Sequence, residues 1–195
     1  QGMLISVGAF DAFRTKRLSL VEFWQHSIAV ATAARFLSTR VNCSADEAFM
    51  AGLLHDIGKL IFAVQAEASY QHVLELKRES AMTSLEAERT LFEFTHPEVG
   101  QMVAERWDLP PRHVAAIAHH HNPADAGNER LFCTLVGLAD QAAYTALSPY
   151  TPVEHHAERI GLLDALDLGP GHWDDCLCHL QEARTTIEAF VGAIQ

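Results

Sequence analysis

The sequence lacks long apolar runs, a signal peptide and any excess of positive charge. Its apolar runs, of which residues 48–54 are an example, are much shorter than the ~20 residues that a membrane-spanning helix needs. We therefore expect a cytoplasmic protein that does not interact with a membrane. The formal net charge is -11 and the arginines and lysines are scattered, so no cationic patch is available for a nucleic-acid backbone. General nucleic-acid binding is not expected.

Cysteines are few and are not arranged in pairs typical of disulfides or structural zinc sites. The four are Cys43, Cys133, Cys176 and Cys178, and none forms a C-x-x-C motif. We expect them to be thiols in the core or on the surface. Sequence repeats and low-complexity tracts are also missing, which excludes a solenoid.

Signals for β-strands are nearly absent, whereas apolar residues recur at spacings of three and four along most of the sequence. This periodicity predicts helices over residues 20–37, 46–62, 70–79, 85–94, 97–107, 111–121 and 131–146. Ser44 is suited to cap the second helix, and Gly58 suits the left-handed position that ends it. Two further helical patterns, over residues 153–166 and 173–194, predict a C-terminal appendage. We therefore predict an all-α bundle with C-terminal helices packed on its core.

The most informative feature is the run HDIGK at residues 55–59, which places an imidazole beside a carboxylate and close to a lysine. Asp56 and Asp140 both follow apolar residues, where an unpaired buried carboxylate would be costly. A cation held by these carboxylates together with His26 and His55 would remove that cost. The mixed nitrogen and oxygen donors suit one or two divalent ions, namely iron, manganese, magnesium, zinc, cobalt or nickel.

A second ion would need a bridging carboxylate and further imidazoles. Asp56 is the candidate bridge, because a carboxylate can link two ions about 3.5 to 4 Å apart. His96 and the triplet 119–121 contain the additional histidines. Neighbours on a helix point about 100° apart, so at most two of the triplet can serve one centre.

Such a centre would acidify a bound water for attack on a phosphoester, while Lys59 takes up charge on the phosphate oxygens. Asp56 and Lys59 are therefore the candidate catalytic residues. Glu22 lies one helical turn before His26 and could orient that imidazole or serve as a further ligand. Ordinary structural roles compete with these interpretations: a lone histidine such as His26 is more often a hydrogen-bonded core residue, and Lys59 could simply complement a helix dipole.

Five stretches carry a resemblance to known proteins: FWQHS at 23–27, AFMAGLLHDIGKL at 48–60, HPEVG at 96–100, WDLP at 107–110 and IAHHHNP at 117–123. In these stretches the chain resembles the HD superfamily of metal-dependent phosphohydrolases. Within that superfamily it is most similar to the HD-related output domain (HDOD) of bacterial signalling proteins. The resemblance extends from about residue 18 to residue 146.

The resemblance implies roles for individual residues. The positions that match the HD metal ligands are His26, His55, Asp56 and Asp140. The positions that match the extra histidines of the related cyclic-di-GMP phosphodiesterases are His96, His120 and His121. Lys59 matches their phosphate-proximal lysine. Asn122 replaces the glutamate that follows the histidine pair in those enzymes, and no Gly-Tyr-Pro motif follows, so cyclic di-GMP is not the expected substrate.

The resemblance also implies a domain organisation. Family members carry a helical lobe before this core and often follow a receiver domain. Residues 1–17 would then be an expression-tag remnant and the end of a missing lobe, residues 18–147 the HD-type core and residues 148–195 the helices packed on it. The chain would be a fragment or a shortened form. Expected partners are a receiver or other signalling domain and a phosphorylated small molecule or nucleotide.

Two functions remain open from the sequence. The first is a signal-transduction output module that binds metal and hydrolyses a phosphoester or nucleotide, which the intact ligand set favours. The second is a catalytically silent regulatory scaffold that binds a protein partner or senses a ligand, which the missing glutamate and Gly-Tyr-Pro motif favour.

Overall fold

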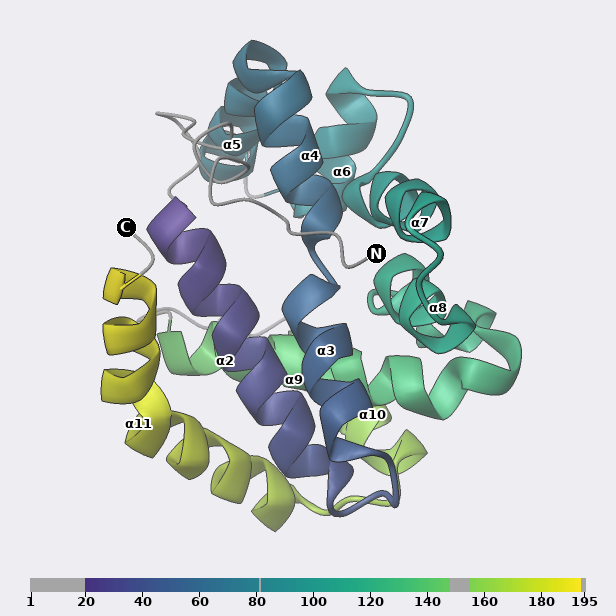
Figure 1. Ribbon diagram of the computed structural model, residues 1–195, viewed down its shortest axis with the longest axis vertical. Helices are drawn as coiled ribbons and strands as arrows, with labels where there is room; N and C mark the ends of the chain where they lie inside the picture. Colours follow the sequence, from purple (N-terminus) through teal and green to yellow (C-terminus); the bar gives the residue numbers. More distant parts are fainter. Residues whose placement is uncertain (1–19, 81, 148–154, 194–195) are drawn as a thin grey trace, which may run out of the picture.

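The computed structural model describes residues 20–80, 82–147 and 155–193, and every regular element in these ranges is helical (Figure 1). The α-helices are α2 (Leu20–Ser38), α3 (Ala45–Leu54), α4 (Ile57–Gln65), α5 (Glu67–Ser80), α6 (Ser84–Leu91), α7 (His96–Arg106), α8 (Pro111–His119), α9 (Arg130–Leu147), α10 (His155–Ala165) and α11 (Pro170–Ala193). Two short 3-10 helices, η1 (Pro123–Asp125) and η2 (Gly127–Glu129), connect α8 to α9. The predicted all-α fold is confirmed.

Helices α2, α3 and α9 form the centre of the main core. Every residue of α9 from 132 to 139 is buried, so this helix is enclosed on all sides for two turns. Alanines on α2 leave room for a close approach of α3. A Cβ atom added to Gly52 would lie 2.8 Å from the Cα atom of Ala31, so only glycine fits this crossing. The small residues bring the middle of α2 close to the end of α3, and the rings of His26 on α2 and His55 after α3 lie 5.3 Å apart.

The helix predicted over residues 46–62 is divided into α3 and α4, with His55 and Asp56 at the break. Ser44 caps α3 as predicted, because its side chain accepts a hydrogen bond from the backbone of Glu47. The predicted left-handed role of Gly58 is wrong, since Gly58 lies inside α4 and Gly127 is the glycine with positive φ in the described chain. Gly58 instead allows close helix packing: an added Cβ would lie 2.0 Å from the carbonyl oxygen of His96.

Helices α4, α5 and α6, which lie at the top of Figure 1, surround a second, smaller apolar cluster. Its buried members are Phe62, Ala63, Tyr70, Val73 and Ala87. A capping box between Thr83 and Glu86 fixes the start of α6. A corresponding pair starts α7, where the Glu98 carboxylate accepts a hydrogen bond of 2.7 Å from the backbone of Thr95. These caps set the position of His96, the first residue of α7.

The two C-terminal helices pack against the main core. Buried side chains of α10 and α11 join those of α2 and α9, as Leu163, Trp173 and Leu180 show. The cysteines are all free: Cys133 and Cys176 are buried, as expected for core thiols. No helix in the described ranges is long and apolar enough to cross a membrane. Residues 1–17, expected to be a tag remnant and the end of a lobe, lie outside the described residues.

Candidate metal centre

Seven side chains that the sequence nominated as metal ligands meet at one place. They come from five parts of the fold: α2, the break between α3 and α4, the start of α7, the end of α8, and α9. The seven residues are His26, His55, Asp56, His96, His120, His121 and Asp140. Side chains that are distant in the sequence therefore form a single polar cluster within an otherwise apolar bundle.

Asp56 lies in the middle of this cluster, and its two oxygens face different histidines. Oδ1 lies 3.2 Å from Nε2 of His96 and 3.7 Å from Nε2 of His120. Oδ2 lies 3.4 Å from Nε2 of His55 and 3.7 Å from Nε2 of His26. A carboxylate placed in this way has the geometry of a bridge between two cations.

The ligand atoms fall into two groups, within each of which all atoms lie within 4.8 Å of one another. The first group is Asp56, His96, His120 and His121, and the second is His26, His55 and Asp140. An ion with bonds of about 2.0–2.2 Å to nitrogen and oxygen holds ligand atoms at separations of this order. Each group could therefore hold a metal ion, and Oδ2 of Asp56, a member of the first group, also faces His26 and His55 of the second.

Backbone carbonyls orient two of the buried imidazoles. Nδ1 of His55 lies 2.8 Å from the carbonyl oxygen of Gly52, and Nδ1 of His120 lies 3.0 Å from that of Ile117. A carbonyl can only accept, so each Nδ1 carries a proton, and Nε2 is the nitrogen left to bind a cation. This is the outer-shell arrangement typical of metal-bound histidines.

Three atoms aimed into the cluster are buried without a hydrogen-bond partner: Nε2 of His55, Nε2 of His120 and Oδ1 of Asp56. Leaving such atoms unpaired costs about 1–3 kcal/mol each. A cation that displaced the His55 proton would satisfy all three at once, so the donor set fits a metal.

The charges of the cluster also suit a cation. Burial raises the pKa of Asp56, but His55 and Lys59 outweigh this and hold that pKa well below its usual range. Burial and the proximity of His96 lower the pKa of His121 to about 3, so its imidazole is neutral. Burial lowers the pKa of His55, yet Asp56 and Asp140 together raise it to about 10. A proton on His55 therefore competes with a cation for the same lone pair.

Lys59 lies at the more open edge of the cluster. Its Nζ donates a hydrogen bond of 2.5 Å to Oδ2 of Asp56. The side chains of Lys59, His26 and Asp140 are 20%, 22% and 21% exposed, whereas that of Asp56 is 2% exposed. A ligand can therefore reach the cluster from the side of Lys59, His26 and Asp140.

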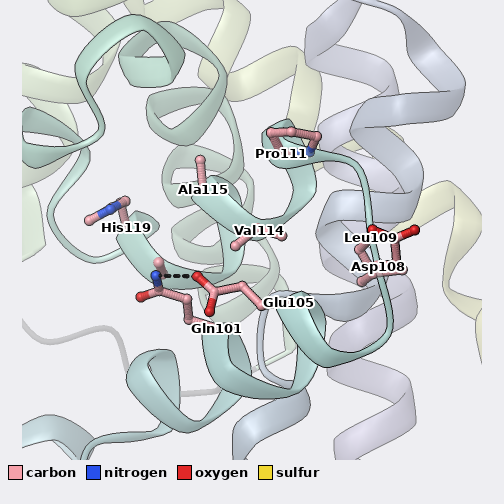
Figure 2. A pocket seen from close by; sticks show the side chains of 9 residues that line it. Gln101, Glu105, Asp108, Leu109, Pro111, Val114, Ala115 and His119 are labelled. Carbon is pink, nitrogen blue, oxygen red and sulfur yellow. Dashed lines mark hydrogen bonds between the residues drawn. The ribbon is translucent and has the colours of Figure 1, made fainter.

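The histidine triplet divides as helix geometry requires. His120 and His121 face the cluster, whereas His119 lines a separate cavity of about 420 Å³ between α7 and α8 (Figure 2). Glu105 accepts a hydrogen bond from Gln101 in the same cavity. None of the seven candidate ligands lines this cavity.

Glu88 is a functional candidate that sequence reasoning missed. Its side chain on α6 is fully buried, and its Oε2 atom lies 2.8 Å from Nδ1 of His96. The sequence gives only a weak sign that Glu88 is buried, namely its position after Ala87 on the apolar face of a short helix. Two other glutamates are close in the sequence, so this sign does not single out Glu88. Glu22, the residue suggested to orient His26, is exposed.

The chain is similar to several known proteins in sequence and fold. Ribonuclease Y of Thermus thermophilus is 34% identical over 143 residues, which cover 73% of this chain and 20% of that protein. The chain therefore spans about a fifth of the length of this relative. An HDOD domain protein of unknown function from Geobacter sulfurreducens has a TM-score of 0.75 and 25% identity. That match covers 95% of this chain and 67% of the Geobacter chain.

The MmoQ response regulator of Methylococcus capsulatus shares the fold, with a TM-score of 0.66 and 23% identity over 87% of this chain and 65% of that one. The sequence profile of the HDOD domain matches residues 1–123. The resemblance seen in the sequence is thereby confirmed, and the chain belongs to the HDOD domain family.

Proposed function

We propose that this chain is a signal-transduction module that binds two divalent metal ions and hydrolyses a phosphoester. The observation that carries the proposal is the position of Asp56, whose two oxygens face two separate sets of ligands. A structural metal site needs a single closed set of ligands, whereas paired ions bridged by a carboxylate are typical of phosphoester hydrolysis.

The chain's own residues account for most of the proposed mechanism. Asp56, His96, His120 and His121 would hold one ion, and His26, His55 and Asp140 the other, which Oδ2 of Asp56 would also face. Bound divalent ions supply a water of lowered pKa and accept charge from phosphate oxygens. Lys59, at the open edge, is placed to bind a phosphate oxygen. The buried side of the cluster keeps bulk water away from the ligands.

The substrate class that we propose is a small phosphodiester or phosphomonoester, such as a nucleotide. Similarity to a protein named Ribonuclease Y supports a phosphodiester as the substrate class. A net charge of -11 disfavours a long RNA, because a polyanion would be repelled except at the cluster itself.

We also propose that a receiver or other signalling domain controls the module, a proposal supported by the likeness to the MmoQ response regulator. The division into an HD-type core at residues 18–147 and added helices at residues 148–195 belongs to this proposal. It is supported by the packing of α10 and α11 on the outside of α2 and α9.

Metal analysis followed by an activity assay tests the proposed function. We expect about two equivalents of metal and turnover of bis(p-nitrophenyl) phosphate or of one member of a nucleotide panel. Asp56→Asn should lose both metal and turnover, because an amide cannot bridge two cations. Asp46→Asn, in an exposed surface ion pair with Arg35, is the matched control and should keep both. Bound metal without turnover on the whole panel would instead indicate the catalytically silent scaffold.

A further inference from the structure

Glu88 and His96 form a buried pair beside the candidate metal centre. The Glu88 carboxylate lies 2.8 Å (Oε2) and 3.0 Å (Oε1) from Nδ1 of His96, and its Oε2 also accepts a 2.7 Å hydrogen bond from the His96 backbone. Both side chains are 0% exposed. A buried carboxylate without such partners would be strongly disfavoured, so this contact is the reason that Glu88 can occupy the interior.

The pair determines which nitrogen of His96 is available to a cation. A carboxylate accepts hydrogen bonds, so its two oxygens place the imidazole proton on Nδ1. Nε2 of His96 then carries the lone pair and points at Oδ1 of Asp56, 3.2 Å away, and at Nε2 of His121, 3.1 Å away. Backbone carbonyls orient the imidazoles of His55 and His120, whereas the Glu88 carboxylate orients that of His96.

We infer that Glu88 is a positioning residue that sets the tautomer and orientation of His96 and thereby selectively supports the ion held by Asp56, His96, His120 and His121. The inference rests on the proposed function, because it assumes that this group holds an ion. Among the described residues, the hydrogen bonds and the ion pair of Glu88 are with His96, so the other group, formed by His26, His55 and Asp140, should depend on it less.

Replacement of Glu88 by glutamine gives the sharpest test. The glutamine oxygen can replace only one carboxylate oxygen, so an amide N–H would face Nδ1 at the other position. Donor facing donor favours movement of the His96 proton to Nε2, which then cannot bind a cation. Loss of an outer-shell partner of this kind costs about 10- to 100-fold in metal affinity.

The experiment compares the full chain with its Glu88→Gln, Glu88→Ala and Glu93→Gln variants. Nitrogen-15 NMR of the imidazoles in chelator reports the tautomer of His96 without any metal, and titration with Mn²⁺ or Co²⁺ reports stoichiometry and affinity. Glu93 is exposed in the segment between α6 and α7, and its replacement removes the same charge. A circular dichroism melt confirms that each variant is folded.

We expect a Nδ1-protonated His96 in the parent chain and in Glu93→Gln, with two ions bound. In Glu88→Gln the His96 proton should shift to Nε2, and the ion held by the group that contains His96 should bind about 10- to 100-fold more weakly. Glu88→Ala, if folded, should bind one ion only. Unchanged tautomer and unchanged affinity in folded Glu88→Gln would overturn the inference. Failure of the parent chain to bind any ion would instead overturn the proposed function, and the NMR result would still report the role of Glu88.

Discussion

Nε2 of His26 lies 3.0 Å from Oδ1 of Asp140, which links α2 to α9 at the open edge of the cluster. The two helices pack along the main core, so the contact is set by the fold and not by local sequence. It places one imidazole and one carboxylate, each about one-fifth exposed, where they can share a cation with His55.

Replacement of Asp140 by asparagine should weaken metal binding at this edge. Asp140 keeps a strongly lowered pKa because His26 and His55 outweigh the effect of burial, so it is ionised at neutral pH. Loss of a direct ligand should reduce affinity by more than the about 10- to 100-fold that an outer-shell partner costs. Isothermal titration with Mn²⁺ measures this. Equal affinity in parent and variant would show that Asp140 is not a ligand.

Metal affinity should rise with pH. The pKa of His55 is raised to about 10, so His55 carries a proton at neutral pH that a cation must displace. One displaced proton corresponds to roughly a tenfold gain in affinity for each pH unit below that pKa. Titrations in buffers of different ionisation enthalpy count the protons released. Affinity that does not change between pH 6 and 9 would contradict the role of His55.

Thermal stability should respond to pH in opposite ways with and without a chelator. The folded-state pKa of His55 is higher than its ordinary value, so its charge contributes stability that is complete below about pH 6.5 and is lost as the pH rises toward 10. In chelator, this contribution should therefore shrink above neutral pH. With saturating metal, stronger binding should stabilise the fold over the same range. Melting temperatures that change with pH in the same direction in chelator and with saturating metal would contradict the prediction.

Gly58→Ala should destabilise the fold, because the new Cβ would lie 2.0 Å from the carbonyl oxygen of His96. Backbone cannot give way as a side chain can, so we expect a loss of at least about 1–3 kcal/mol in the free energy of unfolding. Gly161→Ala, at an exposed position of α10 with open space around it, is the matched control. It should be neutral or stabilising by about 0.5–1 kcal/mol. Urea unfolding of both variants separates the two outcomes.

Lys59→Gln should reduce turnover while leaving both ions bound. Lys59 is ion-paired with Asp56 at the open edge, and burial, which lowers its pKa, is outweighed by Asp56, so it is cationic. Loss of one charge-stabilising donor costs about 10²- to 10³-fold in kcat. Steady-state kinetics on the active phosphoester, with Arg184→Gln on the exposed surface of α11 as control, measures the effect. Loss of metal together with activity would show that Lys59 only supports Asp56.

The sequence predicted the helical class from local signals, and it predicted the residues of the cluster with the help of the resemblance to the HD superfamily. Apolar periodicity revealed the helices, and the HDIGK run with its distant histidines revealed the candidates. The break between α3 and α4 was not located correctly: Gly58 was expected to end the helix, whereas α3 ends at Leu54 and Gly58 lies inside α4. The break is stabilised by tertiary packing: Gly58 lies against the backbone at the start of α7.

Glu88 escaped prediction for a related reason. Its partner His96 lies beyond the end of α6, in another helix, and no spacing rule joins a buried glutamate to an imidazole eight residues later. Only the capped turns before α6 and α7 bring the two side chains together. Contacts that depend on the relative placement of two helices require the three-dimensional structure.

The central claim is that Asp56 lies between two cations. Crystals grown with Mn²⁺ and measured for anomalous scattering test it most directly. We predict two anomalous peaks about 3.5–4 Å apart, one on each side of the Asp56 carboxylate. At saturating Mn²⁺, the absence of any peak within bonding distance of Asp56 would contradict the claim.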